Sequence, residues 1–290
     1  MGLSVEELNK HLDDMSQIPN ERWIDGLDER KRKELEFHDM HRDPQTKTQH
    51  DADTFEKLYG NYKYYNTTRL STEHVDNWIK LRAPGKIVLD YACGDGKMAI
   101  DAAKAGAKLA IGIDISKVSV DNATAAAAKA GVGDRCRFVQ ADAENTHLPN
   151  DAVDVVLCNG MLHHLDLSYA FPELRRVMAP GAVLLAVEAL DYNPAIKLYR
   201  MLTPAMRTEW EAAHILSLKD VRFAKRFFEV GEVRYWHLSS PVAANMPALL
   251  PLLNSVDSLL TRIPLMKLMA WIFTFELWKK APSAHKSAAA

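Results

Sequence analysis

The sequence predicts an α/β fold built around a doubly wound, mainly parallel β-sheet. Short apolar segments alternate with helix-forming segments between residues 87 and 188, and a turn containing Gly94 and Gly96 joins the first of them to its helix. Apolar segments of strand length that alternate with helices indicate parallel strands joined by crossover helices. With 290 residues, 48% of them hydrophobic, the chain is long enough for a sizeable core with attached segments.

Residues 88–96 begin this pattern. They read as an apolar strand that ends in an acid, Asp90, followed by a tight turn and by a helix from about 97 to 105. A second strand, 109–113, also leads into an acid, Asp114. A strand, a glycine turn, a helix and a further strand with a terminal acid are typical of a nucleotide-binding βαβ unit.

The turn differs from the loops that bind phosphate groups. It lacks the pattern G-x-G-x-x-G, and the chain has no G-x-x-x-x-G-K-[ST] segment. Asp90 and Asp95 lie in the turn, and carboxylates repel phosphate. The turn therefore favours a ligand that carries positive charge.

This turn resembles the glycine loop of class I S-adenosylmethionine-dependent methyltransferases, where an acid precedes the pattern x-Gly-x-Gly-x-Gly. Residues 90–96 read Asp-Tyr-Ala-Cys-Gly-Asp-Gly, so Ala92 stands at the first glycine position. Alanine tolerates a positive φ poorly, and we expect a small shift of the loop without loss of binding. The resemblance is close over about residues 86–190 and continues, in order and spacing, through 140–144, 148–149, 153–159, 161–165 and 174–181.

The resemblance implies a Rossmann-like, seven-stranded doubly wound sheet whose last strand is antiparallel, with an N-terminal and an inserted helical cap. It also implies S-adenosyl-L-methionine as cofactor and S-adenosyl-L-homocysteine as product. We expect four segments: an N-terminal helical cap (1–83), the cofactor-binding core (84–190), inserted cap helices (191–218), and the C-terminal part of the core with an apolar helix (219–280).

Further elements follow from local patterns outside the core. A charged, helix-prone segment covers 20–43, and a helical insertion covers 193–215. We expect an apolar helix over 248–261. The sixth strand is expected over 230–240 and the last, antiparallel strand over 268–279.

The resemblance also implies cofactor contacts. Asp90 and Gly94 would contact the methionine part, with Asp90 holding its ammonium group, and Asp114 would accept both ribose hydroxyls. Asp142 would accept the adenine amino group. The other implied contacts are Ile115 on the adenine face, the Ala143 backbone amide, Asn159 near the methionine carboxylate, Ala92 and Gly96 in the loop, and Tyr65 closing over the sulfonium.

These contacts also have structural alternatives. Asp90 and Asp114 can merely cap the helical turns that follow them. Asp142 can be an ordinary loop acid, and Asn159 can be a strand end without a ligand. The tyrosine-rich run 59–65 can pack the N-terminal cap on the core and leave the cofactor uncovered.

Histidine side chains are the candidates for a general base, because histidine titrates near neutrality and accepts a hydroxyl proton. His163 and His164 follow the fourth strand, and His214 lies on the inserted element with Arg200, Arg207 and Glu211. Paired histidines at this place in the family also occur without a base role, and His214 can lie on a solvated helix face. Glu188, at the end of the fifth strand, either orients the substrate or caps a helix.

We expect no metal ion. His38-x-x-His41 has a spacing that two metal ligands can share, but no further ligands cluster with it in the sequence. Metal-dependent catechol methylases place carboxylates after the fourth strand, and Asn159 stands at that position. The three cysteines, at 93, 136 and 158, lack metal-type spacing and fit buried thiols in a reducing, cytoplasmic compartment.

The C-terminal third is apolar. No charged residue occurs from Leu238 to Val256, but Pro241, Pro247 and Pro251 interrupt the segment. A membrane-spanning helix needs about 20 consecutive apolar residues with an intact backbone. We therefore expect a buried cap-and-core helix, with an apolar rim that touches a lipid-like substrate or a membrane face as the alternative.

We expect methyl transfer to a small molecule, at a hydroxyl oxygen of a secondary metabolite, a sugar-like unit or a quinone-like ring. The alternatives are C- or O-methylation of a quinone or lipid-like substrate, and a non-catalytic binding protein that kept the fold, which Ala92 supports. A net charge of −2 gives no electrostatic reason to bind nucleic acid. A homodimer is compatible with the sequence.

Overall fold

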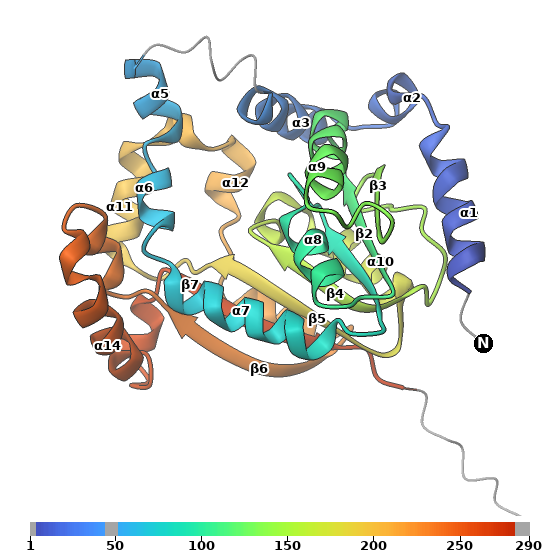
Figure 1. The fold of residues 1–290 in the computed structure, drawn as a ribbon. Helices are drawn as coiled ribbons and strands as arrows, with labels where there is room; N and C mark the ends of the chain where they lie inside the picture. Colours follow the sequence, from blue (N-terminus) through green and yellow to red (C-terminus); the bar gives the residue numbers. More distant parts are fainter. Residues whose placement is uncertain (1–3, 44–51, 282–290) are drawn as a thin grey trace, which may run out of the picture.

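The fold is described from a computed structural model, which covers residues 4–43 and 52–281. Its centre is one seven-stranded sheet in the order β3-β2-β1-β4-β5-β7-β6 (Figure 1). The strands are β1 (Ile87–Tyr91), β2 (Leu109–Asp114), β3 (Cys136–Gln140), β4 (Val153–Asn159), β5 (Met178–Ala189), β6 (Glu229–Trp236) and β7 (Ile272–Trp278).

The strand directions confirm the predicted fold class. Strands β1 to β5 pair in parallel, whereas β7 pairs antiparallel with both β5 and β6. The last strand of the chain is thus inserted between β5 and β6. The sheet is doubly wound, with the first crossover helices on one face, as the alternation of strands and helices predicted.

Helices cover both faces of the sheet and form the cap. The α-helices are α1 (Val5–Ser16), α2 (Asn20–Asp25), α3 (Glu29–Arg42), α5 (Ala52–Tyr59), α6 (Tyr62–Tyr65), α7 (Arg69–Arg82), α8 (Lys97–Lys104), α9 (Lys117–Lys129), α10 (Leu167–Val177), α11 (Pro194–Leu202), α12 (Glu209–Ala213), α13 (Leu218–Ala224) and α14 (Leu250–Leu260). The 3₁₀-helices are η1 (Leu162–His164), η2 (Pro204–Met206), η3 (Ser240–Ala244), η4 (Pro247–Leu249) and η5 (Met266–Met269).

Two buried hydrophobic clusters lie on opposite faces of the sheet. On one face α1, α10 and α13 contribute side chains such as Leu8, Phe171 and Val221. On the other face α7, α8 and α9 contribute side chains such as Trp78 and Met98. Helices α1 and α7 therefore belong to the packed core, although both lie in the segment 1–83 expected to form a cap.

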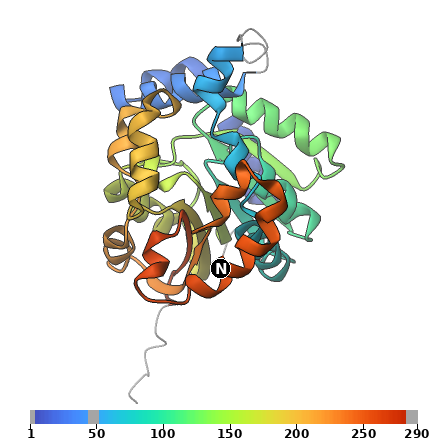
Figure 2. The same cartoon turned by 90° about the vertical axis from the view of Figure 1, so that its left-hand side faces the viewer.

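The cap gathers at the side of the molecule away from α1. Figures 1 and 2 show α5 and α6, α11 and α12, and α14 on that side. Helix α3 lies beside α9 and across the carboxyl-end edge of the sheet, where the Asn122 side chain donates a hydrogen bond to the Arg42 carbonyl at 3.2 Å. This position of α3 determines the geometry of the site.

Several element boundaries differ from the sequence expectation. The charged segment 20–43 forms two helices, because Asp28 caps α3 by accepting a hydrogen bond from the Lys31 amide. The insertion 193–215 is broken at Pro204 into α11, η2 and α12. The sixth strand ends at Trp236, because His237 has a left-handed backbone (φ 63°), and the last strand begins only after η5.

The turn after β1 shows why its small residues are needed. Ala92, Gly94 and Gly96 all have positive φ, of 57°, 53° and 74°. A Cβ atom on Gly96 would lie 2.7 Å from the Ala123 Cβ, so glycine is required there by space as well as by φ. Ala92 adopts the left-handed conformation that a glycine would adopt, at a cost of about 1 kcal/mol.

Candidate functional site

The parallel strands end at one edge of the sheet, and two neighbouring cavities lie against that edge. Asp114 closes β2 and Asn159 closes β4. The smaller cavity, of about 40 Å³, contacts Asp114. The larger one, of about 300 Å³, contacts Asn159. Ligands of open α/β sheets bind at this edge, so both cavities are candidate binding sites.

The smaller cavity brings together most of the adenosine contacts that the resemblance implied. Its core-side wall consists of Ala92, Asp114, Ile115, Asp142 and Ala143, followed by Met161, His164 and Leu165. Its other wall is one face of α3, made by Arg30, Lys31, Glu34, His38 and Arg42. The sequence did not predict that α3 forms part of this site.

Asp114 is held in place by the backbone around it. Its carboxylate accepts hydrogen bonds from the amides of Gly94 and Ser116, each at 2.9 Å, and only 2% of the residue is exposed. Arg42 Nη1 lies 3.2 Å and 3.4 Å from the two carboxylate oxygens. Arg42 therefore binds the carboxylate to which ribose hydroxyls would donate.

Asp142 shows the same arrangement at the next strand end. Its Oδ1 accepts the Glu144 amide at 2.9 Å, and its Oδ2 accepts Lys31 Nζ at 2.6 Å. Lys31 also lies 2.9 Å from Glu144 Oε2, and Arg30 donates to Glu144 Oε1 at 2.6 Å. The cations of α3 thus neutralise the acids at the tips of β2 and the β3–β4 connection.

A cavity of 40 Å³ has room for about one water molecule. The donors, acceptors and loop geometry fit an adenosine group, because two carboxylates are preorganised by backbone amides and face the same space. The space itself is filled by Arg42 and Lys31. A nucleoside-sized ligand therefore requires the side chains of α3, or the helix, to move.

Asp90 lies beneath the glycine turn. It is 3% exposed, and its Oδ2 accepts a hydrogen bond from the Ala99 amide at 2.9 Å. Burial and, less strongly, the neighbouring Asp114 raise the pKa of this carboxyl to about 7, against the amide hydrogen bonds, which lower it. Asp90 lines neither of the two cavities.

The larger cavity lies between the ends of β4 and β5 and the cap. Its apolar wall consists of Tyr64, Tyr65, Val187, Ala195, Ile196, Tyr199, Met206, Trp271 and Ile272. Polar side chains project into the same space: Asn61, Asn159, His163, Glu188, Arg200, Arg207 and Glu211. Tyr65 and Asn159 thus lie in this cavity and apart from Asp114 and Asp142.

His163 and Glu188 form a buried pair in the larger cavity. Nδ1 of His163 lies 2.6 Å from Glu188 Oε2, while Glu188 Oε1 accepts the amides of Met161 and Leu162 at 2.9 Å and 2.8 Å. Nε2 of His163 lies 3.9 Å from Glu211 Oε1. The carboxylate of Glu188 fixes the imidazole so that Nδ1 carries a proton and Nε2 is left for a ligand.

The other two candidate bases lie elsewhere. His164 lines the smaller cavity, where its Nδ1 contacts Glu34 Oε2 at 2.8 Å. His214 lies outside both cavities: its ring stacks on Trp210 with a centroid separation of 3.7 Å, and its Nδ1 contacts the Trp210 carbonyl. The structure brings only His163 of the three into the larger cavity.

Comparison with known proteins supports the same interpretation. Residues 88–181 match a family described as a methyltransferase domain. The core of this chain is a class I S-adenosylmethionine-dependent methyltransferase domain. Its cofactor is S-adenosyl-L-methionine.

The curated relatives of the methyltransferase domain have different acceptors in their names. A 27-O-demethylrifamycin SV methyltransferase of Amycolatopsis mediterranei (strain S699) is 40% identical over 119 residues, which are 41% of this chain and 43% of the relative. A ribosomal protein L11 methyltransferase of Pasteurella multocida (strain Pm70) is 33% identical over 150 residues, 50% of this chain and 48% of the relative. The matches span less than half of each relative.

Solved structures share the fold at low identity. A geranyl diphosphate methyltransferase in complex with GPP and sinefungin aligns with a TM-score of 0.54 at 16% identity, covering 73% of this chain and 78% of that one. The magnesium protoporphyrin IX methyltransferase of Synechocystis PCC 6803, with bound SAH, gives 0.53 at 18% identity, covering 77% and 88%. The [4+2]-cyclase SpnF gives 0.51 at 19%, covering 72% and 80%, so the fold alone does not specify the reaction.

The raised pKa of Asp90 predicts a pH dependence of stability. The folded state keeps the Asp90 proton up to about pH 7, whereas the unfolded chain releases it near 3.8, so this residue lowers stability as pH rises from 4 to 7 and adds no further slope above 7. We expect the unfolding free energy of Asp90→Asn, minus that of the native chain, to rise by up to about 1.4 kcal/mol per pH unit in this range. Urea denaturation of both proteins at pH 5, 6, 7 and 8 measures this difference. A difference that stays constant with pH would show that Asp90 is ionised in the fold.

The position of Asp114 predicts its role in binding. Asp114→Asn is expected to weaken binding of S-adenosylhomocysteine at least tenfold in isothermal titration calorimetry, because a carboxylate accepts both ribose hydroxyls more strongly than an amide. The matched control is Asp101→Asn, which replaces a carboxylate paired with the exposed Lys97 on α8. Equal dissociation constants for Asp114→Asn and the control would remove Asp114 from the cofactor site.

Proposed function

We propose that this chain transfers a methyl group from S-adenosylmethionine to a hydroxyl oxygen of a small molecule, with His163 as general base. The observation that carries the proposal is the buried pair of His163 and Glu188 in a cavity next to the cofactor-binding edge. Support also comes from the rifamycin relative, whose name specifies O-methylation. The relatives that act on ribosomal protein L11 leave other acceptors open.

The residues of the larger cavity are suited to deprotonate a bound hydroxyl group. Glu188 cannot rotate away, because two backbone amides hold its Oε1 while Oε2 holds His163. The acceptor hydroxyl donates its proton to His163 Nε2 as its oxygen forms the new bond to carbon. Bound S-adenosylmethionine would supply the methyl carbon on its sulfonium, with the neutral thioether as the leaving group. Glu188 stabilises the imidazolium that results.

The cavity wall indicates what kind of acceptor fits. The aromatic side chains of Tyr64, Tyr65, Tyr199 and Trp271 favour a flat, apolar body. Arg200 Nη1 is buried without a hydrogen-bond partner, and its nearest carboxylate oxygen, on Asp191, lies 3.8 Å away. Burial lowers the pKa of this guanidinium, and the neighbouring Arg207 lowers it further. We propose an acceptor that combines a ring-like body with an oxygen-rich or anionic group facing Arg200.

The proposed base predicts a kinetic result. His163→Gln is expected to lower kcat by about 10²- to 10⁴-fold without changing the dissociation constant of S-adenosylhomocysteine, because the residue acts on the acceptor. His214→Gln should retain the rate, since His214 lies outside the cavity. The measurement is methyl transfer to a panel of hydroxylated aromatic compounds, followed by mass spectrometry. A His163→Gln enzyme with the native rate would remove His163 as base.

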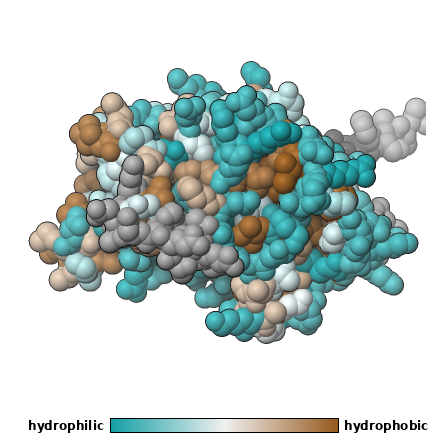
Figure 3. Space-filling view, turned by 90° about the horizontal axis from the view of Figure 1, so that it is seen from above, coloured by the Kyte–Doolittle hydropathy of each residue, from teal (hydrophilic) through white to brown (hydrophobic). Residues whose placement is uncertain are grey.

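A lipid-like acceptor is the second candidate. The surface around η3, η4 and α14 exposes large apolar side chains, and Pro241 of η3 lines the larger cavity. The face seen from above in Figure 3 is mainly hydrophilic on its right-hand side and carries hydrophobic patches on its left-hand side. In the part of the chain that the structure covers, no helix has the length and apolar character needed to span a bilayer. The exposed apolar side chains of the surface around η3, η4 and α14 are Val242, Met246, Leu252, Val256, Leu259, Ile263 and Leu265.

Liposome co-sedimentation distinguishes the two candidates. If the acceptor is lipid-like, the chain should sediment with vesicles, and Leu259→Ser with Leu265→Ser should abolish sedimentation because each change removes apolar area from the exposed surface. The control is Leu81→Ser, which removes a side chain that is 74% exposed on α7. A native chain that stays in the supernatant would leave the small-molecule acceptor as the only candidate. Neither candidate requires nucleic acid or a second copy of the chain.

A further inference from the structure

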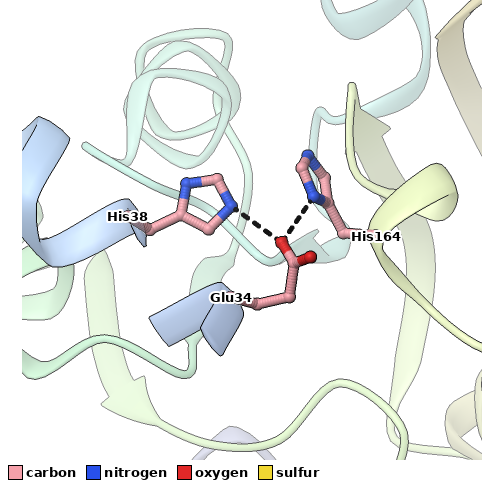
Figure 4. A group of neighbouring side chains, drawn as sticks. All are labelled: Glu34, His38 and His164. Carbon is pink, nitrogen blue, oxygen red and sulfur yellow. Dashed lines mark hydrogen bonds and ion pairs between the residues drawn. The ribbon is translucent and has the colours of Figure 1, made fainter. Parts of the chain in front are cut away.

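Three potential metal ligands converge where α3 meets the segment after β4. Glu34 and His38 lie one turn apart on α3, and His164 lies on η1 (Figure 4). Glu34 Oε2 is 2.8 Å from His164 Nδ1 and 3.7 Å from His38 Nε2. All three ligand atoms lie within 4.8 Å of one another.

One of these atoms is buried without a hydrogen bond. His38 Nε2 has no hydrogen-bond partner although it is inaccessible to solvent, and it points towards the Glu34 carboxylate (Figure 4). A buried polar atom without a partner costs about 1 to 3 kcal/mol. A separation of 3.7 Å is too long for a hydrogen bond to Glu34.

Neighbouring groups already orient the other two ligands. Thr208 Oγ1 donates a hydrogen bond to Glu34 Oε1, which leaves Oε2 facing the two histidines. Arg30 Nη1 donates a hydrogen bond to the His164 carbonyl at 2.9 Å and so holds the backbone from which the His164 side chain projects. Partners of this kind hold the ligands of metal sites in proteins.

We propose that Glu34 Oε2, His38 Nε2 and His164 Nδ1 bind a divalent transition-metal ion of the zinc type, with a fourth position left for water or a ligand. Zinc binds imidazole nitrogen and carboxylate oxygen at about 2.0 to 2.2 Å, which places two ligand atoms of a tetrahedral site about 3.3 Å apart. The two separations given above lie on either side of this value.

The sequence did not indicate this site. His41, the partner of His38 in the spacing His38-x-x-His41, contacts the Phe37 carbonyl through Nδ1 and is outside the cluster. The ligands come from two segments that are 126 residues or more apart in the chain and meet only through the docking of α3. A bound ion would fix α3 to η1 and stabilise the arrangement in which Arg42 and Lys31 fill the smaller cavity.

Metal binding is measured on the full chain after treatment with a chelator. Isothermal titration with Zn²⁺ should give one site per chain, and Co²⁺ should produce visible absorption bands of a four-coordinate site. His38→Gln, Glu34→Gln and His164→Gln should each weaken Zn²⁺ binding at least tenfold, and Zn²⁺ should raise the Tm of the native chain. The matched control, His214→Gln, should keep native affinity, because His214 lies outside the cluster.

Two results would overturn the proposal. The first is a native chain that binds neither Zn²⁺ nor Co²⁺ in the micromolar range. The second is a His38→Gln chain that binds Zn²⁺ as tightly as the native chain. His38→Gln is the least disruptive variant, because Nε2 makes no hydrogen bond, and circular dichroism without metal shows whether each variant is folded. Neither measurement depends on methyl transfer.

Discussion

The attraction between the cations of α3 and the carboxylates at the strand tips determines the rest of the site. The parallel sheet brings acids together at one edge, where Asp114 and Asp142 face the same small space. Such a group of buried negative charges is costly unless cations neutralise it. Arg42 and Lys31 supply that charge in the structure. In a cofactor-bound state the ribose hydroxyls would donate to Asp114 and the adenine amino group to Asp142 in place of Arg42 and Lys31, and the ammonium and sulfonium groups would add positive charge at the same edge.

The docking of α3 also organises the groups that do not touch the cofactor acids. Glu34 connects α3 to His164 and to Thr208 in the inserted cap, so one residue joins the N-terminal segment, the sheet edge and the cap. The adjacent His163 is directed away from α3 by Glu188 and faces the larger cavity. The two neighbouring histidines therefore have different surroundings: His164 lines the smaller cavity and His163 lines the larger one.

The fold and the loop were predictable because they depend on local patterns. Apolar strands that end in Asp90 and Asp114, with glycines between them, give the βαβ unit directly. The family resemblance then supplied the antiparallel last strand, and the pairing of β7 with β5 and β6 confirms it. The choice among His163, His164 and His214 was not predictable, since it depends on which carboxylate packs beside each ring. The sequence showed only that the segment 20–43 is charged and helix-prone, and the role of α3 was not predictable because Arg42 and Asp114 meet only through tertiary packing.

A crystal structure of the chain with S-adenosylhomocysteine bound tests the assignment of the cofactor site most directly. We expect the ribose hydroxyls on Asp114 and the adenine amino group on Asp142, with Arg42 and Lys31 moved off these carboxylates and the sulfur facing the larger cavity. A ligand bound elsewhere, with Arg42 still paired to Asp114, would contradict this assignment. It would show that α3 is a permanent part of the core and that the acids serve only to hold it.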